Sequence, residues 1–151
     1  MKLSTRGRYA VMALADMAGQ VAQGRDAAVP LAEISARQEI SLAYLEQLFG
    51  ALRRAGLVAS RRGAQGGYCL TRAPEEIRIG DITRAVDEPV TVTRCGNRGG
   101  CLRRHARCMT HDLWAELGAH IYAFLDAATL ADVVHGRFGD EAAQVNVEAV
   151  R

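Results

Sequence analysis

Apolar residues between positions 42 and 55 recur with the period of an α-helix. At 100° per residue they occupy one arc of about 120°, which predicts a helix with a single buried face. The apolar positions are Leu42, Leu45, Leu48, Phe49 and Leu52. The opposite arc carries small and hydrogen-bonding residues, namely Ala43, Gln47, Gly50 and Arg54, flanked by Glu46 and Arg53. Ser41 is a favourable N-cap and Gly56 a favourable stop, so a helix is expected between them.

Two further helices are predicted before this segment. The first is apolar on most sides, has Ser4 or Thr5 as its cap and is expected to run to about residue 21, largely buried. Pro30 fits a helix start, so residues 31–38 are predicted to form a short second helix.

A β-hairpin is predicted after the third helix. Residues 57–62 and 68–71 are expected to form strands joined by the glycine-containing turn 63–67, with Arg61 and Arg62 at the tip. Three helices and a basic hairpin in this order predict a mainly α fold with a small β-hairpin wing, the winged helix-turn-helix. Its third helix would enter the major groove of double-stranded DNA, and the wing would reach the adjacent backbone or minor groove. The alternative use of this fold is contact with another protein.

A second apolar seam lies in the last third of the chain. Thr110 is a candidate cap for a long helix whose seam residues are Leu113, Leu117, Ile121, Phe124 and Ala128. Such a seam would pair with another helix, most simply the same helix of a second copy in a homodimer. The alternative is packing onto the chain's own domain.

The expected organisation has four parts. Residues 1–73 form the winged helix-turn-helix domain, and residues 74–110 a connector, with a small helix starting near Asp81, and a cysteine loop. Residues 111–136 form the C-terminal dimerisation helix, and residues 137–151 a tail that is expected to be disordered.

Charge is distributed unevenly between the two halves. Residues 1–72 contain ten Lys/Arg against five Asp/Glu, a net charge of +5, whereas residues 73–151 contain nine against twelve, a net charge of −3. A basic N-terminal half favours a polyanionic partner. No run approaches the roughly 18 consecutive apolar residues of a membrane span, and the N-terminus lacks the features of a signal peptide. A cytoplasmic protein with no membrane partner is therefore expected.

Residues 94–111 hold three of the four cysteines and two of the four histidines. A C-x5-C-x6-C-x2-H array is formed by Cys95, Cys101, Cys108 and His111. Thiolates and a neutral imidazole bind either Zn²⁺ or an iron–sulfur cluster, and the spacing alone leaves both open. His105 is a rival fourth ligand, and Cys69 in the wing is expected to pack as an apolar residue.

Several motifs resemble, in the same order, the iron–sulfur-sensing transcription regulators of the IscR type. In the DNA-binding region they are KLSTRGRYAV (2–11), PLAEIS (30–35), ISLAYLEQLF (40–49), LRRAGLV (52–58) and RGAQGGY (62–68). Before the cysteine loop they are IGDI (79–82) and AVDE (85–88). The resemblance covers roughly residues 1–135 and is specific, because separate motifs agree in order.

The resemblance implies a homodimeric winged-helix repressor or activator that controls genes of iron–sulfur cluster biogenesis or iron homeostasis. It also implies a [2Fe–2S] cluster held by three cysteines and one histidine, with Zn²⁺ as the alternative. The positions that match are Cys95, Cys101, Cys108 and His111. Six residues separate the second and third cysteines, where the family pattern has five. The first helix has no acid before Asp16, which favours histidine over the aspartate ligand of nitric-oxide-sensing relatives.

Candidate DNA contacts follow from the outward face of the third helix. Gln47 can pair with adenine, and Glu46 can accept a hydrogen bond from cytosine N4. Ala43 offers a methyl contact, for example to thymine. Arg53 and Arg54 are expected to reach phosphates.

Arg62 in the wing is the candidate for minor-groove insertion.

Three other functions fit parts of the sequence less well. A zinc-stabilised regulator would need only a structural metal, and an iron–sulfur carrier would not need the DNA-facing third helix. A Cys108–His111 nucleophile pair lacks a surrounding strand–turn context and oxyanion donors, so no enzyme is expected.

Overall fold

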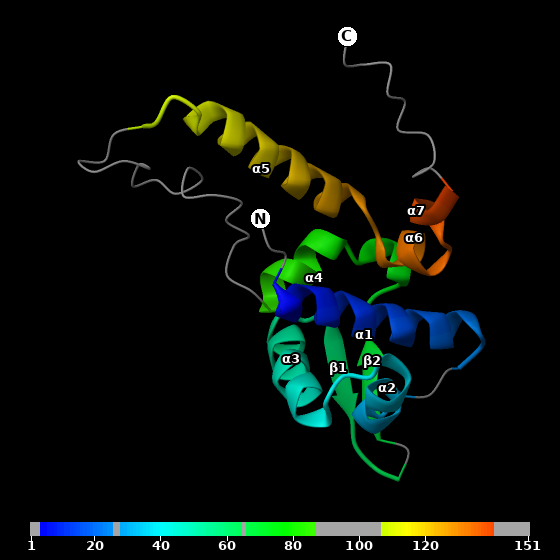
Figure 1. Ribbon diagram of the computed structural model, residues 1–151. Coiled ribbons are helices and arrows are strands. Elements are labelled where there is room, and N and C mark those ends of the chain that lie inside the picture. The colour runs from blue at the N-terminus through cyan, green and yellow to red at the C-terminus, as the bar shows by residue number, and fades with distance from the viewer. Residues whose placement is uncertain (1–3, 26–27, 65, 87–106, 141–151) are drawn as a thin grey trace.

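The computed structural model describes residues 4–25, 28–64, 66–86 and 107–140. Within these ranges the chain is mainly helical with one two-stranded antiparallel sheet, which confirms the expected fold class. Helix α1 crosses the middle of the molecule; α2, α3 and the hairpin lie on one side of it, and α4 and α6 on the other (Figure 1). Helix α5 extends away from this body (Figure 1).

The first three helices lie close to their predicted positions. They are α1 (Thr5–Ala22), α2 (Leu31–Gln38) and α3 (Leu42–Arg54). Both predicted caps form, because Ser4 Oγ accepts the Gly7 N–H at 3.1 Å and Ser41 Oγ accepts the Tyr44 N–H at 3.3 Å. Gly56 follows α3 with a φ of 73°, a left-handed conformation that glycine adopts without a Cβ clash.

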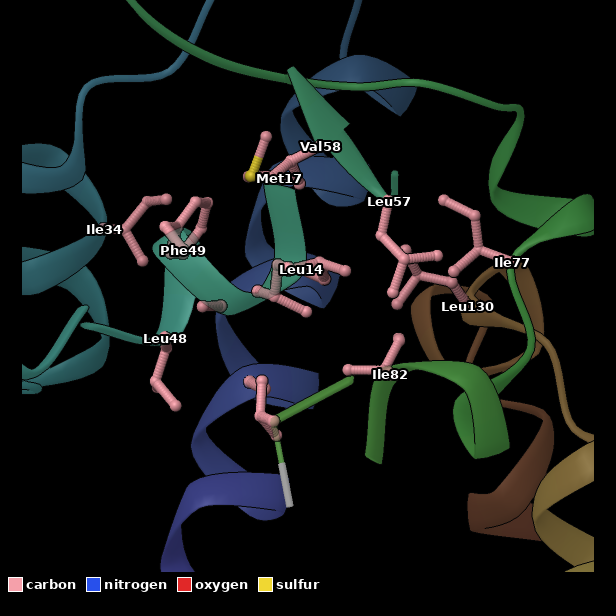
Figure 2. Packing of buried hydrophobic residues seen from close by; sticks show 14 of the residues in the cluster. Leu14, Met17, Ile34, Leu48, Phe49, Leu57, Val58, Ile77, Ile82 and Leu130 are labelled. Atoms are coloured by element: carbon pink, nitrogen blue, oxygen red, sulfur yellow. The ribbon is translucent and has the colours of Figure 1, made fainter. Parts of the chain in front are cut away.

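The core lies between α1, α3, the hairpin, α4 and α6 (Figure 2). Its largest fully buried side chains are Phe49, Leu14, Met17, Ile34, Leu45, Leu48, Leu52, Leu57, Ile77, Ile82, Leu130 and Val29. The Phe49 ring meets the Tyr68 ring edge-on, with 4.9 Å between centroids. Leu42 was expected on the buried arc but is 43% exposed, whereas Leu45 in the same turn is fully buried.

The wing is an antiparallel hairpin of β1 (Val58–Arg61) and β2 (Gly67–Leu70). The outer edge of β2 is held by Val29, whose N–H and C=O exchange hydrogen bonds with Tyr68 at 2.8 and 2.9 Å. This close approach requires glycine at position 67, because a Cβ there would lie 2.5 Å from the Val29 carbonyl.

The core continues across residue 74, where the sequence suggested a boundary. The short 3₁₀ turn η1 (Pro74–Glu76) leads into α4 (Ile79–Val86), which begins earlier than the expected start near Asp81. Ile77 and Ile82 are fully buried with the side chains of α1 and α3. Residues 77–86 therefore pack as part of the winged-helix body.

The last described helices are α5 (His111–Ala127), α6 (Leu130–Val134) and α7 (Arg137–Asp140). Thr110 precedes α5, but its Oγ1 accepts the Trp114 Nε1–H at 3.1 Å and does not cap the helix. Residues 137–140 are helical, which corrects the expectation of disorder there, and the rest of the tail lies outside the described residues. Among the described helices, none is long and apolar enough to cross a membrane.

Two backbone hydrogen bonds attach the end of α5 to the body. The Ile79 N–H donates to the Ala128 carbonyl at 3.0 Å, and the Leu130 N–H donates to the Ile77 carbonyl at 2.9 Å. Ala128 and Leu130 are both buried. The C-terminal end of α5 is thus fixed beside α4, while its N-terminal end projects outward (Figure 1).

Candidate nucleic-acid interface and metal centre

The outward face of α3 is the first part of the candidate DNA interface. Its exposed side chains are Ala43, Glu46, Gln47, Arg53 and Arg54. Leu45 and Leu48 point the opposite way and are buried, which agrees with the two predicted arcs. Glu46 and Gln47 are adjacent on the exposed face, so both are available to the edges of bases.

Two guanidinium groups stand at the end of α3. The Arg54 side chain extends back along the helix to Gly50. Its Nη1 would lie 3.7 Å from a Cβ added at that glycine. In the described part of the chain, neither Arg53 nor Arg54 forms an ion pair with a carboxylate. Their charges are therefore available for phosphate.

The wing adds two more exposed cations. Arg61 pairs in register with Gly67 at the end of the hairpin, and Arg62 follows it. The turn beyond them is closed by the Gly66 N–H, which donates to the Gly63 carbonyl at 2.9 Å, and Gly63 has a φ of 113°. Arg61 was predicted only to lie at the tip, but its position makes it as good a DNA candidate as Arg62.

Sequence reasoning did not select Arg8 as a DNA candidate. The Arg8 guanidinium lies 5.9 Å from the centre of the Tyr9 ring, and that ring meets the Tyr44 ring of α3 edge-on at 5.7 Å. An exposed cation thus lies near the first turn of α3. The signal was present in the basic pair Arg6 and Arg8 at the start of α1, but the proximity to α3 arises only in the fold.

An ion-pair network fixes α2 against α1. The Arg37 guanidinium donates to both carboxylate oxygens of Asp16, with Nη2 at 2.8 Å, and Gln38 Nε2 donates to Asp16 at 3.0 Å. Arg25 Nη1 and Arg37 Nη1 both donate to Glu33, at 2.6 and 3.1 Å. The hydrogen bonds from Arg25 and then Arg37 lower the pKa of Glu33 to about 2. The network joins α2 to α1, and α2 also packs on α3.

Half of the predicted metal-binding set lies in the described residues. Cys108 and His111 belong to one turn at the start of α5, where the Cys108 carbonyl accepts the His111 N–H at 3.0 Å. Both side chains are half-buried. The Cys108 Sγ lies 3.5 Å from Thr110 Oγ1. A helix N-terminus stabilises a thiolate, so this turn suits a thiolate and an imidazole that bind one metal group.

The other predicted ligands, Cys95 and Cys101, lie outside the described residues, as does the rival His105. In the part of the chain that is described, no group of three or more His, Cys, Asp or Glu side chains is arranged to hold a metal ion. The described pair fits a metal or cluster by the chemistry of its donors and by its short separation along the chain.

The predicted dimerisation seam is exposed in the single chain. Leu113, Leu117 and Phe124 are 62%, 39% and 59% exposed, and Ile121 is half-buried. Its C-terminal end does contact the same chain, because the Phe124 ring meets the Phe138 ring edge-on at 5.7 Å and Ala128 is buried. The N-terminal part of the seam is left exposed. His120, expected at an interface or in a core, has a side chain that is 72% exposed and lies 3.5 Å from the Glu116 carboxylate.

A match to a known protein family covers most of the chain. The Rrf2 family model, described as an iron-dependent transcriptional regulator, matches residues 3–136. This chain belongs to the Rrf2 family. Among similar Rrf2 proteins, the HTH-type transcriptional regulator IscR of Aliivibrio salmonicida is 51% identical over 134 residues, which are 89% of this chain and 77% of that protein. IscR of Yersinia pestis is 49% identical over 137 residues, 91% of this chain and 81% of the relative.

Solved Rrf2 structures agree with the fold. T. potens IscR superposes with a TM-score of 0.73 at 38% identity, over 95% of this chain and 91% of that one. CymR, the global cysteine regulator of B. subtilis, superposes with a TM-score of 0.75 at 32% identity, over 89% and 97%. The chain is thus an IscR-like helix-turn-helix transcriptional regulator. The relatives' names describe regulators of transcription, which agrees with the expectation of a protein that is not an enzyme.

Proposed function

We propose that this Rrf2 protein is a cytoplasmic, homodimeric sensor of iron–sulfur status. A [2Fe–2S] cluster would be held by Cys95, Cys101, Cys108 and His111. The regulated genes would serve iron–sulfur cluster biogenesis or iron homeostasis. The family description as iron-dependent and the similarity to IscR proteins support this proposal.

One observation carries the proposal. Cys108 and His111 stand together at the N-terminal end of α5, and the other end of α5 is attached to the winged-helix body. Three thiolates and one imidazole are a donor set that holds a [2Fe–2S] cluster, and such a cluster makes the protein responsive to iron and sulfide supply. A ligand pair at the end of the projecting helix is well placed to influence that helix.

A side-chain clamp couples α5 to the DNA-binding body. Arg84 of α4 lies 2.7 Å from Asp126 at the end of α5 and 2.9 Å from Asp81. Gly80 makes room for this contact, because a Cβ there would collide with the Asp126 carboxylate. Helix α4 packs on α1 and α3. Ligation of His111 would fix the start of α5. A change in the orientation of α5 would then reach α3 through the Arg84–Asp126 contact and helix α4.

DNA recognition would divide between two groups of residues on the proposed interface. Glu46 and Gln47 would discriminate bases in the major groove, with Ala43 in van der Waals contact. Arg53 and Arg54 would bind phosphates, and Arg62 would enter the minor groove. In a dimer, two α3 helices one DNA turn apart (about 34–36 Å) would read two half-sites, so a change in the direction of α5 would alter the fit.

Metal analysis of anaerobically purified protein tests the cluster. We expect red-brown protein with near-equal iron and acid-labile sulfide. Replacing Cys95, Cys101 or Cys108 by Ala should abolish the colour, whereas the matched control Cys69→Ala should retain it. Stoichiometric zinc without sulfide would contradict the proposal and leave a zinc-stabilised regulator.

DNA selection tests the sensing. The wild-type protein and its Cys101→Ala variant are compared across a library of DNA sites at fixed salt, since affinity depends steeply on salt. Different sequence preferences are expected. Identical preferences and affinities would leave the metal a structural role, and absence of specific DNA binding would favour an iron–sulfur carrier.

A further inference from the structure

Two adjoining cavities lie behind the wing, away from the outward face of α3. The larger, of about 390 Å³, runs along the outer edge of β2 and is bounded by the C-terminal part of α1. The smaller, of about 140 Å³, lies between the end of α1, η1 and α6. Val21 and Pro74 line both cavities, so the two adjoin each other.

The larger cavity has a cationic wall. Arg61 and Arg72 both line it, and in the described part of the chain neither forms an ion pair. Arg25 also lines it, but its guanidinium is bound to Glu33 at 2.6 Å. Two arginine residues that have no ion pair in the described residues therefore contribute to this wall, and Arg72 also lines a neighbouring hollow that contains Asp81. Guanidinium groups are the donors best suited to a carboxylate.

A backbone donor faces the same place. Tyr68 directs its N–H and C=O outward to Val29, and Leu70, two residues further along β2, directs its own polar groups to the same edge. No described backbone group pairs with the Leu70 N–H. Because Val29 already occupies the edge at Tyr68, only one residue of edge is left, which is too little for an added peptide strand.

The remaining walls are apolar. Met17, Val29 and Leu70 line the larger cavity, and Val21 is 48% exposed between the two. The smaller cavity is lined mainly by alanine and valine side chains, with Glu75 and His135 as its polar residues. An apolar depression that ends at a pair of cations matches a ligand with an acidic head and a short hydrocarbon body.

We propose that this depression binds a small amphiphilic carboxylate. Its carboxylate would lie between Arg61, Arg72 and the Leu70 N–H, and its hydrocarbon chain would cross Val21 toward the smaller cavity. Engaging Arg61 would withdraw one cation from the wing and tie the hairpin to α1. The ligand would then weaken DNA binding. This last consequence rests on the proposed DNA interface, whereas ligand binding itself does not.

Sodium hexanoate is the probe for the binding test, which follows the Leu70 amide of the full-length protein by NMR. We expect the chemical shift of the Leu70 amide to change saturably, with a dissociation constant for hexanoate below about 10 mM. Such weak binding is expected of a small ligand that makes few contacts. Butanoate should bind about tenfold more weakly, since it buries two fewer methylene groups. Hexanol and inorganic phosphate should each bind at least about tenfold more weakly than hexanoate. Hexanol lacks the carboxylate that the arginines would bind, and phosphate lacks the hydrocarbon chain.

Two arginine variants test the position of the head group. Arg72→Gln should weaken hexanoate binding about tenfold, whereas Arg62→Gln, which removes a neighbouring charge outside the cavity, should leave it unchanged. No saturable shift, equal binding of hexanol, or unchanged binding by Arg72→Gln would overturn the proposal.

A DNA arm separates the ligand site from its effect. Hexanoate should lower the DNA affinity of the wild-type protein and lower it much less for Arg72→Gln. If hexanoate binds as expected but DNA affinity is unchanged, the ligand site stands and its coupling to the wing is refuted. If DNA binding is absent altogether, the NMR result still decides the ligand site.

Discussion

The winged-helix body and helix α5 are built from similar residues but bury them to very different degrees. In the body, Leu14 and Phe49 have no exposed surface. Helix α5 has no fully buried residue along its seventeen positions, and Leu113 and Phe124 are more than half exposed. The body buries its apolar side chains within the chain, whereas α5 leaves most of its apolar seam exposed.

This difference indicates two sources of stability. A core of close-packed side chains stabilises the body without a partner. An isolated helix of this length is marginal in water, and a contiguous exposed apolar face marks an interaction site. Helix α5 is therefore expected to depend on contacts outside its own chain, whereas α1 and α3 are not.

The largest expected effect is on the oligomer. The double change Leu117→Glu, Ile121→Glu would place unpaired carboxylates in the proposed helix–helix interface. Because those charges would lose hydration on burial, we expect the dimer to dissociate to a folded monomer in sedimentation experiments. A soluble dimer of unchanged affinity would show that the seam is not the interface.

Leu42 supplies a matched control for this variant. It is an exposed leucine of the body, 43% accessible at the start of α3. Leu42→Glu should leave the oligomeric state unchanged, since only the α5 face is expected to pair. Dissociation in both variants would point to a general loss of folding.

The next effect is on the stability of the body. Phe49→Ala removes a fully buried ring that packs on Tyr68. Loss of that packing should lower the free energy of unfolding by about 3–5 kcal/mol, measured with denaturant. Phe124→Ala, the matched change in α5, should cost far less in the monomeric double variant because its ring is 59% exposed. Equal losses would remove the contrast between the two regions.

A smaller effect is expected on DNA specificity, which should depend on the body alone. Gln47→Ala should reduce discrimination among operator sequences by about 1–3 kcal/mol. Arg53→Ala should weaken binding to all sequences alike and lower the slope of affinity against salt by about one. Equilibrium binding to selected and scrambled sites at several salt concentrations separates the two. A uniform loss from Gln47→Ala would contradict its role in base reading.

Local signals made most of the body predictable. Ser4 and Ser41 cap their helices as expected, because capping depends on residues within one turn. The packing of residues 77–86 was not predictable, because Ile77 and Ile82 are separated by an irregular spacing and meet Leu130 far along the chain. The prediction that the Thr110 side chain caps α5 was wrong, because its hydroxyl oxygen accepts a hydrogen bond from the Trp114 Nε1–H instead of a backbone N–H.

The candidate site also combines features that local sequence predicts with features that depend on contacts between distant segments. The exposed face of α3 followed from the 100° period, since the period fixes which side chains share a face. The nearness of Arg8 to α3 depends on the contact of two tyrosine rings from different helices. The Arg84–Asp126 clamp joins segments 42 positions apart in the sequence, a distance at which periodicity carries no information.

The smallest expected effect concerns pH and distinguishes the ion pairs of the body from those of α5. Hydrogen bonds from Arg25 and Arg37 lower the pKa of Glu33 from 4.5 to about 2. A carboxylate with a lowered folded-state pKa stabilises the fold above its unfolded pKa, and this contribution is lost as the pH falls toward the folded value. The stability difference between the parent and Glu33→Gln should therefore be constant above about pH 5 and shrink between about pH 4.5 and 2.

The measurement is denaturant unfolding in the Cys101→Ala background, so that a bound metal does not contribute to the titration. The effect should be modest because Glu33 is partly exposed and water screens it. Asp112→Asn in α5 is the control, since its side chain is 89% exposed and lies 3.7 Å from Arg107. That variant should change stability little at any pH. A stability difference for Glu33→Gln that stays constant down to pH 2 would show that the network does not hold α2 to α1 in solution.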